Sequence, residues 1–193
     1  MHPSIVNTSL DPFSSQVREA ARRIVESREA AVSGLYDLTA TRLLRYAVTI
    51  TRNQHDAEDA LQIAFTRIAS SPATLQQADS PWPYLLKIVR NESLVILRRK
   101  KRWSFLGELT DLLTQVLVDD KVHEETHREV WKALRTLPTE QSEIVVLKIW
   151  ESMTFAQIGE LLEISSATAA SRYRYALGKL EAKFRVADSE VNR

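Results

Sequence analysis

The chain has 193 residues, of which 44% are hydrophobic and 26% charged, with a net charge of +1 and no cysteine. This length allows one medium domain or two small ones, and the composition excludes wholesale disorder. The lack of cysteine excludes disulfides, thiolate chemistry and cysteine-based zinc sites, and it fits a reducing compartment. Residues 1–10 lack the basic flank and apolar run of a signal peptide, and no stretch approaches the ~18 apolar residues of a membrane helix. We therefore predict a cytoplasmic protein.

Helical patterns dominate the first half of the chain. Only four glycines and six prolines occur in the whole sequence, and apolar residues recur at helical rather than strand spacing. The spacing predicts helices over 13–33, 35–51 and 56–70, with Asn53 as a turn or N-cap before the third. A polar loop is expected at residues 72–80. Pro81 suits the first position of a further helix, which runs into the basic stretch Arg98-Arg99-Lys100-Lys101-Arg102.

The second half begins after a mixed stretch that we interpret as a linker. Its predicted helices lie near 124–135, 139–150, 154–162 and 166–184. The fold class is therefore all-α, with two small helical domains. The predicted organisation is a partly helical leader at 1–34, a first domain at 35–102, a linker at 103–123, a second domain at 124–185 and a tail at 186–193.

The clearest local signal is a helix-turn-helix pattern. Thr154 and Gln157 form a capping-box pair, in which each side chain accepts from the other's free backbone N–H and so starts a helix sharply. Residues 163–165 make a tight connection, and Ser165 or Ser166 is expected to cap the next helix. Two helices joined by so short a turn can project the second one into a major groove.

The last predicted helix has an inner and an outer face. Its inner face is expected to contain Ala169, Tyr173, Ala176, Leu177 and Leu180. The outer stripe is expected to contain Thr168, Ser171, Arg172 and Tyr175. Arginine in such a stripe can read guanine edges, and hydroxyls can reach bases or phosphates. Arg174 and Lys179 are expected to lie nearer the DNA phosphate backbone and to add salt-dependent affinity for DNA. The alternative is a helical hairpin with a solvated basic face.

Taken together, these patterns resemble the sigma-70 family, specifically the compact extracytoplasmic-function (ECF) sigma factors that keep regions 2 and 4. The likeness to region 4 lies in Leu134-x-x-Leu137-Pro138, Val145-Val146-Leu147-Lys148, Thr154-Phe155-x-x-Ile158-Gly159-x-x-Leu162 and Ser171-Arg172. The likeness to region 2 lies in Leu43-Leu44-Arg45-Tyr46-Ala47, Asp56-Ala57-Glu58-Asp59-Ala60-Leu61-Gln62, Phe65 and Trp82-x-Tyr84-Leu85-x-x-Ile88-Val89-Arg90-Asn91. The resemblance implies a subunit without catalytic residues or cofactor. It also implies core RNA polymerase and promoter DNA as partners and, by analogy, an anti-sigma factor.

The resemblance implies that the first domain docks on the clamp helices of the largest polymerase subunits. The residues implied are Asp56, Glu58, Asp59 and Gln62. The docking is physically sensible, because the helix dipole tolerates acids at a helix start and a basic partner could find them there. The alternative is an acidic first turn that only stabilises its own helix.

The resemblance also assigns two sets of promoter-contacting residues. For the −10 element they are Trp82, Tyr84, Lys87, Arg90, Asn91, Arg98 and Arg99, where aromatic rings and cations can hold unstacked bases. For the −35 element they are Ser166, Thr168, Ser171, Arg172, Arg174, Tyr175 and Lys179. The chain departs from the family pattern at Ala170 and Tyr175, and it lacks the usual arginine at 141–143, so the −35 contacts are expected to be weaker or rearranged. The leader has no counterpart in the minimal family architecture.

Parts of the sequence also fit two other functions. His123-Glu124-Glu125-Thr126-His127 is a literal His-Glu-x-x-His, which on a helix places two imidazoles one turn apart for zinc. Charged neighbours and the need for a third ligand, with only Glu143 or Glu151 at suggestive distances, make a zinc hydrolase the remote alternative. A helix-turn-helix regulator that binds DNA without polymerase is the nearer one, although it leaves the first domain unexplained.

Overall fold

The computed structural model describes residues 12–24, 28–104 and 125–191, and every regular element in these ranges is a helix. The helices are α1 (Pro12–Arg23), α2 (Arg28–Thr51), α3 (Gln54–Ser70), α4 (Pro72–Gln76), α5 (Pro81–Ser104), α6 (Glu125–Arg135), α7 (Thr139–Ile149), α8 (Phe155–Leu162) and α9 (Ser166–Val191). The predicted all-α class is confirmed for this part of the chain. We call α2–α5 the first module, α6–α9 the second module and α1 the leader helix.

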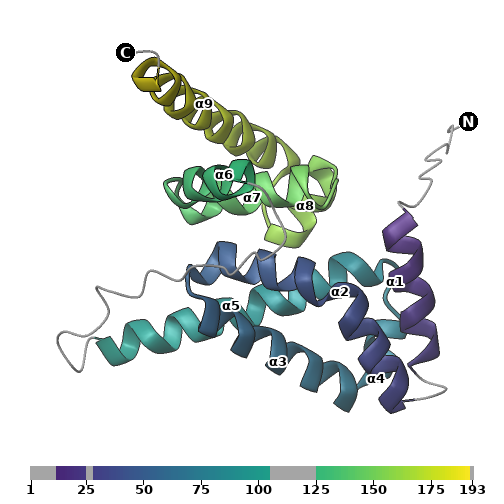
Figure 1. The fold of residues 1–193 in the computed structure, drawn as a ribbon. Coiled ribbons are helices and arrows are strands. Elements are labelled where there is room, and N and C mark those ends of the chain that lie inside the picture. The colour runs from purple at the N-terminus through teal and green to yellow at the C-terminus, as the bar shows by residue number, and fades with distance from the viewer. Residues whose placement is uncertain (1–11, 25–27, 105–124, 192–193) are drawn as a thin grey trace, which may run out of the picture.

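The first module is built on α2, α3 and α5, which pack around fully buried side chains such as Leu43, Tyr46 and Leu85 (Figure 1). Two of its helices, α3 and α5, start close to where the sequence predicts. The side chain of Asn53 accepts from the backbone N–H of Asp56 at 3.0 Å and caps α3, and α5 begins at Pro81.

Three predicted boundaries in this half are wrong. The helix expected over 13–33 ends at Arg23 as α1, and α2 begins at Arg28. The break expected between 33 and 35 is absent, because α2 runs through Gly34. A glycine inside a helix costs about 1 kcal/mol relative to alanine, and the complete burial of Leu35 in the core outweighs that cost. The expected loop at 72–80 contains the short helix α4, which Pro72 pre-organises at its start and Leu75 anchors by complete burial.

The second module follows the predicted helices closely. The capping box at the start of α8 is present in both directions: Gln157 N–H donates to Thr154 Oγ1 at 3.2 Å, and Thr154 N–H donates to Gln157 Oε1 at 2.8 Å. Ser165 caps α9 by accepting from the backbone N–H of Thr168 at 3.0 Å. The helix α9 extends to Val191, beyond the predicted end at 184.

The turn between α8 and α9 is unusually close. Glu163 ends α8 in the left-handed conformation, with φ of 59° and ψ of 43°. A Cβ atom on Gly159 would lie 2.7 Å from the carbonyl oxygen of Ile164 and 3.2 Å from the backbone nitrogen of Ser166. Only glycine therefore lets the backbone of the turn approach α8 this closely.

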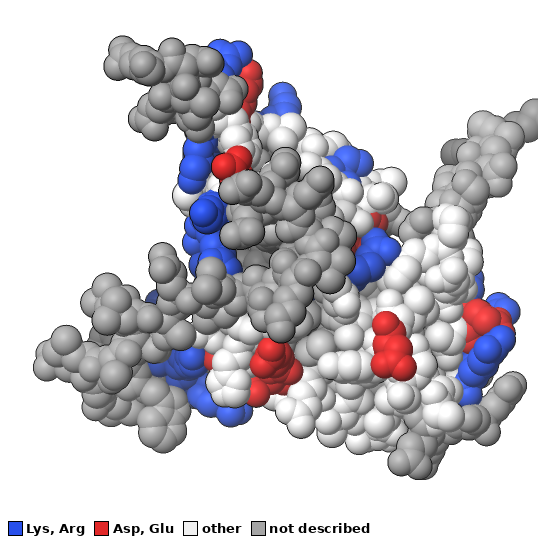
Figure 2. All heavy atoms as spheres, in the orientation of Figure 1, with Lys and Arg blue, Asp and Glu red and all other residues white. Residues whose placement is uncertain are grey.

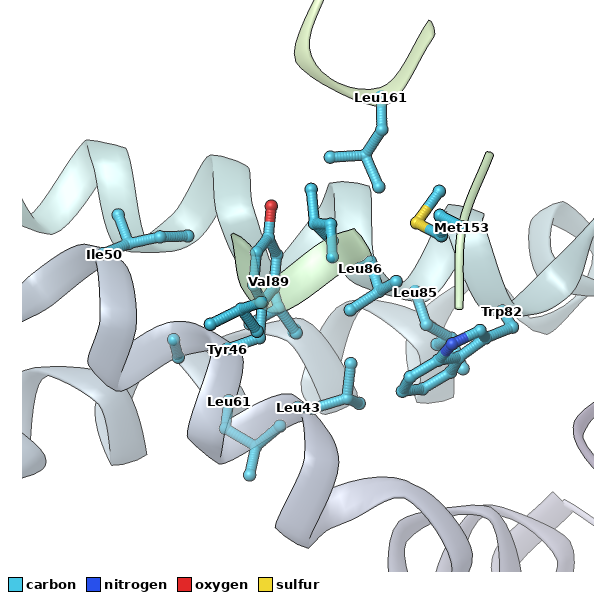
Figure 3. Packing of buried hydrophobic residues seen from close by; sticks show 14 of the residues in the cluster. Leu43, Tyr46, Ile50, Leu61, Trp82, Leu85, Leu86, Val89, Met153 and Leu161 are labelled. Carbon is cyan, nitrogen blue, oxygen red and sulfur yellow. The ribbon is translucent and has the colours of Figure 1, made fainter. Parts of the chain in front are cut away.

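The two modules pack directly against each other, with α7 and α8 above α2 and α5 (Figure 1). Their apolar cores join into one cluster. Met153 and Leu161 of the second module point toward Leu85 and Leu86 of the first (Figure 3). The sequence predicted two modules but gave no sign of this contact between them.

Candidate nucleic-acid interface

Most of the basic and aromatic side chains predicted to contact the −35 element on α9 are open to solvent. Tyr175 is 70% exposed, Arg174 and Lys179 are exposed, and Arg172 is half-buried. None of these four side chains makes a hydrogen bond or ion pair with another described residue. They are therefore free to bind an external ligand, and their arrangement on one helix after a tight turn suits a major groove.

The hydroxyls of the predicted stripe are engaged locally. Thr168 Oγ1 lies 2.8 Å from Ser165 Oγ, and Ser171 Oγ donates to the carbonyl of Thr168 at 3.0 Å. Ser166 is exposed at the helix start. On the inner face, Ala169 and Ala176 are buried as predicted, but Leu177 is 37% exposed, so its assignment to the core is wrong.

A second basic surface lies at the end of α5, where Figure 2 shows lysine and arginine side chains gathered. Arg98 and Arg99 are exposed there. Lys100 is turned back instead, and its Nζ lies 2.8 Å from the Asp56 carboxylate. The exposed cations suit contact with phosphates, whose affinity is dominated by such charges.

The remaining residues predicted for the −10 element lie nearer the contact between modules. Trp82 is buried, and its Nε1–H donates to Glu151 Oε2 at 3.1 Å. Arg90 Nε donates to Glu143 Oε1 at 2.7 Å, and Lys87 Nζ lies 3.3 Å from Glu163 Oε1. Tyr84 is half-buried and Asn91 is exposed. Thus carboxylates of the second module bind three of the seven predicted residues.

Two of these carboxylates belong to a buried polar network that sequence reasoning missed. Glu143 also accepts from the hydroxyl of Tyr46 at 2.7 Å, and Glu151 pairs with Arg42 at 2.8 Å. Burial, with the Glu143 charge adding to it, raises the pKa of Tyr46 well above its ordinary value, so the phenol stays protonated and donates. Burial also raises the pKa of Glu151, more than Arg42 lowers it. The available signal was the position of these two acids on either side of an apolar run: Glu143 directly precedes residues 144–147, and Glu151 follows soon after them.

This network also bears on the zinc alternative. His123 lies outside the described residues, as does the side chain of His127. The two proposed third ligands, Glu143 and Glu151, are occupied by Tyr46, Arg90, Arg42 and Trp82. Within the described ranges, no group of three histidine, aspartate or glutamate side chains could hold a metal ion.

The face predicted to dock on the polymerase lies along α3. Glu58 and Gln62 are exposed and Asp59 is half-buried, whereas Asp56 is 4% exposed and paired with Lys100. Glu58 and Gln62 border a groove of about 610 Å³ between α2 and α3. The aromatic rings of Tyr36 and Phe65 line this groove, with their centroids 5.0 Å apart.

Comparison with known proteins accounts for both modules. A model of sigma-70 region 2 matches residues 35–103, and a model of sigma-70 region 4 matches residues 127–180. The chain therefore belongs to the sigma-70 family. With these two regions in that order, and with relatives of the same type, it is an ECF sigma factor that acts in transcription initiation and is not an enzyme. The predicted family, fold and functional class are confirmed.

Several relatives and solved structures are similar to this chain. The probable RNA polymerase sigma factor RfaY of Xanthomonas campestris is 30% identical over 65% of this chain, which spans 33% of that protein. The ECF sigma factor SigW of Bacillus subtilis is 22% identical over 81% of this chain and 90% of its own. The sigma factor RpoE of Bartonella quintana, solved with the anti-sigma factor NepR, has the same fold, with a TM-score of 0.70, 18% identity, and coverage of 80% and 96%. None of the helices in the described ranges is long and apolar enough to cross a bilayer.

Proposed function

We propose that the first module binds core RNA polymerase and opened −10 DNA, and that the second module binds the −35 element through α9. The observation that carries this proposal is a set of side chains on the second helix of a tightly capped helix pair that make no hydrogen bond or ion pair with other described residues: Arg172, Arg174, Tyr175 and Lys179. The proposed domain boundaries remain 35–102 and 124–185.

The −35 contacts are proposed to centre on Arg172. Arg172 lies in the N-terminal half of α9, which is the part of a recognition helix that reaches base edges. Arg174 and Lys179 flank it and suit phosphates, and Tyr175 offers an exposed ring. Thr168 and Ser171 contribute less, because their hydroxyls already have partners inside the helix.

The polymerase contact is proposed to use the α3 face that remains accessible. Glu58, Asp59 and Gln62 supply charge and an amide beside the aromatic groove, so a basic helical partner would meet both polar and apolar surface. Asp56 is buried and pairs with Lys100, so it is not proposed to contact the polymerase.

The −10 contact is proposed to run along α5, from Trp82 and Tyr84 to Arg98 and Arg99. Aromatic rings with nearby cations bind unstacked bases, at about 1–3 kcal/mol per base. Asn91 and the two terminal arginines are exposed. The first part of this surface becomes available only when the second module moves away, because Glu151 holds Trp82.

We infer a cytoplasmic protein that an anti-sigma factor holds inactive. Two similar structures, RpoE and CnrH, were solved with NepR and with the cytosolic domain of CnrY. CnrH has a TM-score of 0.60 and 18% identity to this chain, which covers 97% of it.

The experiment that tests the proposed function is initiation on genomic DNA by core polymerase that carries no sigma factor. Addition of this protein is expected to produce defined transcript starts preceded by two shared promoter elements. A regulator that binds DNA without polymerase would leave core unable to initiate specifically, and that result would refute the proposal. Inhibitor-free protein is required.

A further inference from the structure

The leader helix lies outside the region 2 match, which begins at residue 35, yet it packs firmly on the first module. Val17, Ala21 and Ile24 are buried with 0–1% exposure. At its start, the rings of Phe13 and Trp82 pack nearly perpendicular to each other, with centroids 4.9 Å apart. Further along, Arg18 donates to the carbonyl of Asp79 at 2.7 Å, in the turn just before α5. The leader helix thus contacts the end of α5 where −10 binding is proposed.

One side chain of α2 joins the leader helix to the second module. The guanidinium of Arg42 lies 3.8 Å from the centroid of the Phe13 ring, a cation–π distance. The same guanidinium pairs with Glu151 at 2.8 Å and donates to the carbonyl of Trp150 at 2.9 Å. Phe13 therefore helps to hold Arg42 in the position from which it binds the second module.

The second module presents carboxylates where the first module would meet DNA. Glu151, Glu143 and Glu163 bind Trp82, Arg90 and Lys87 respectively (distances above). Three carboxylates thus bind one aromatic and two basic side chains along α5, in the way that DNA phosphates would bind them. The apolar contact of Met153 and Leu161 with Leu85 and Leu86 lies beside them (Figure 3).

We propose that this arrangement is a self-inhibited closed state, in which the second module covers the −10 surface and the leader helix stabilises the closure through Phe13 and Arg42. This inference rests on the proposed function, because covering α5 inhibits the protein only if α5 binds DNA. The apparent affinity for a ligand of the open state falls with the fraction of open molecules. Weakening the closure therefore raises apparent DNA affinity without any new DNA contact.

The closure can be measured without DNA or polymerase. The natural sequence has no cysteine, so Ala73→Cys on α4 and Ala182→Cys on α9, both at exposed positions, accept spin labels selectively. Pulsed dipolar spectroscopy on full-length protein then reports the distance between modules. Wild type is expected to give one short, narrow distribution. Phe13→Ala combined with Glu143→Arg, which opposes Arg90 with a second cation, is expected to give a longer and broader one.

Matched variants separate the closure from general damage. Ser15→Ala and Glu140→Gln change exposed positions of α1 and α7 and are expected to keep the wild-type distance. Adding Arg90→Glu to Glu143→Arg restores an opposite-charge pair and is expected to restore the short distance. Circular dichroism checks that every variant is helical. An unchanged distance in the combined Phe13 and Glu143 variant, or failure of the charge exchange to restore closure, would overturn the proposal.

A second readout links closure to function. Phe13→Ala is expected to raise affinity for a fluorescent single-stranded oligonucleotide by about tenfold, since Phe13 is not proposed to touch DNA. Lower affinity, with the distance unchanged, would mean that the leader helix only braces the −10 surface and would refute self-inhibition. If the distance lengthens as expected but no variant binds DNA or supports initiation, the closed state stands and the proposed function fails.

Discussion

Gly159 offers the sharpest test of the helix-turn-helix geometry, because a methyl group added at this position would clash with backbone atoms of the turn between α8 and α9. In Gly159→Ala the new Cβ would lie 2.7 Å from the carbonyl oxygen of Ile164, closer than real Cβ contacts, and 3.2 Å from the Ser166 nitrogen. Neither atom can move without shifting the turn. Overpacking of this kind costs about 1–3 kcal/mol, against a helix-propensity gain of about 1 kcal/mol for alanine.

The expected net effect of Gly159→Ala is a loss of up to about 2 kcal/mol in the free energy of unfolding, measured by urea titration with circular dichroism. Gly178→Ala is the matched control, because Gly178 lies in α9 with nothing within 4 Å of an added Cβ. That control is expected to gain up to about 1 kcal/mol. If Gly159→Ala proved as stable as Gly178→Ala, the close approach of the turn to α8 would be refuted.

Three further predictions address binding and pH. Arg172→Ala is expected to weaken −35 duplex binding by about 1–3 kcal/mol while core binding is unchanged; equal loss of both would indicate misfolding instead. Glu58→Lys is expected to weaken binding to core polymerase by about tenfold or more, with native helicity, in a pull-down titration, and unchanged affinity would remove Glu58 from the docking face. Glu151 has a raised pKa in the folded protein, so its contribution to stability is present at low pH and is lost as pH rises from its ordinary 4.5 through the folded value. Glu151→Gln is therefore expected to be at least as stable as wild type at pH 7 and to lose that advantage near pH 4, in parallel urea titrations; a variant clearly less stable at pH 7 would show that the Arg42 pair outweighs burial.

Local features of the fold could be predicted from sequence because their causes are local. The capping box of Thr154 and Gln157, the Asn53 cap and the Pro81 start each depend on residues within one helical turn. The break expected beside Gly34 failed for the opposite reason. There, burial of Leu35 against residues far along the chain overrides the weak local preference of one glycine.

The candidate site shows the same division. The outer position of Arg172 and Tyr175 on α9 follows from helical periodicity, so it could be predicted from the sequence. The burial of Asp56 depends on Lys100, 44 positions away, and the occupation of Trp82 depends on Glu151, 69 positions away. Periodicity carries no information about such pairs, because they arise only when helices distant in sequence meet.

The central claim is that this chain grips core RNA polymerase through its first module. The most direct measurement is a binding titration of purified, inhibitor-free protein against core polymerase at low salt, for wild type and for the combined Phe13→Ala and Glu143→Arg variant. The account predicts a stoichiometric complex for both proteins, because neither substitution lies on the docking face of α3. The absence of any complex with either protein would contradict it.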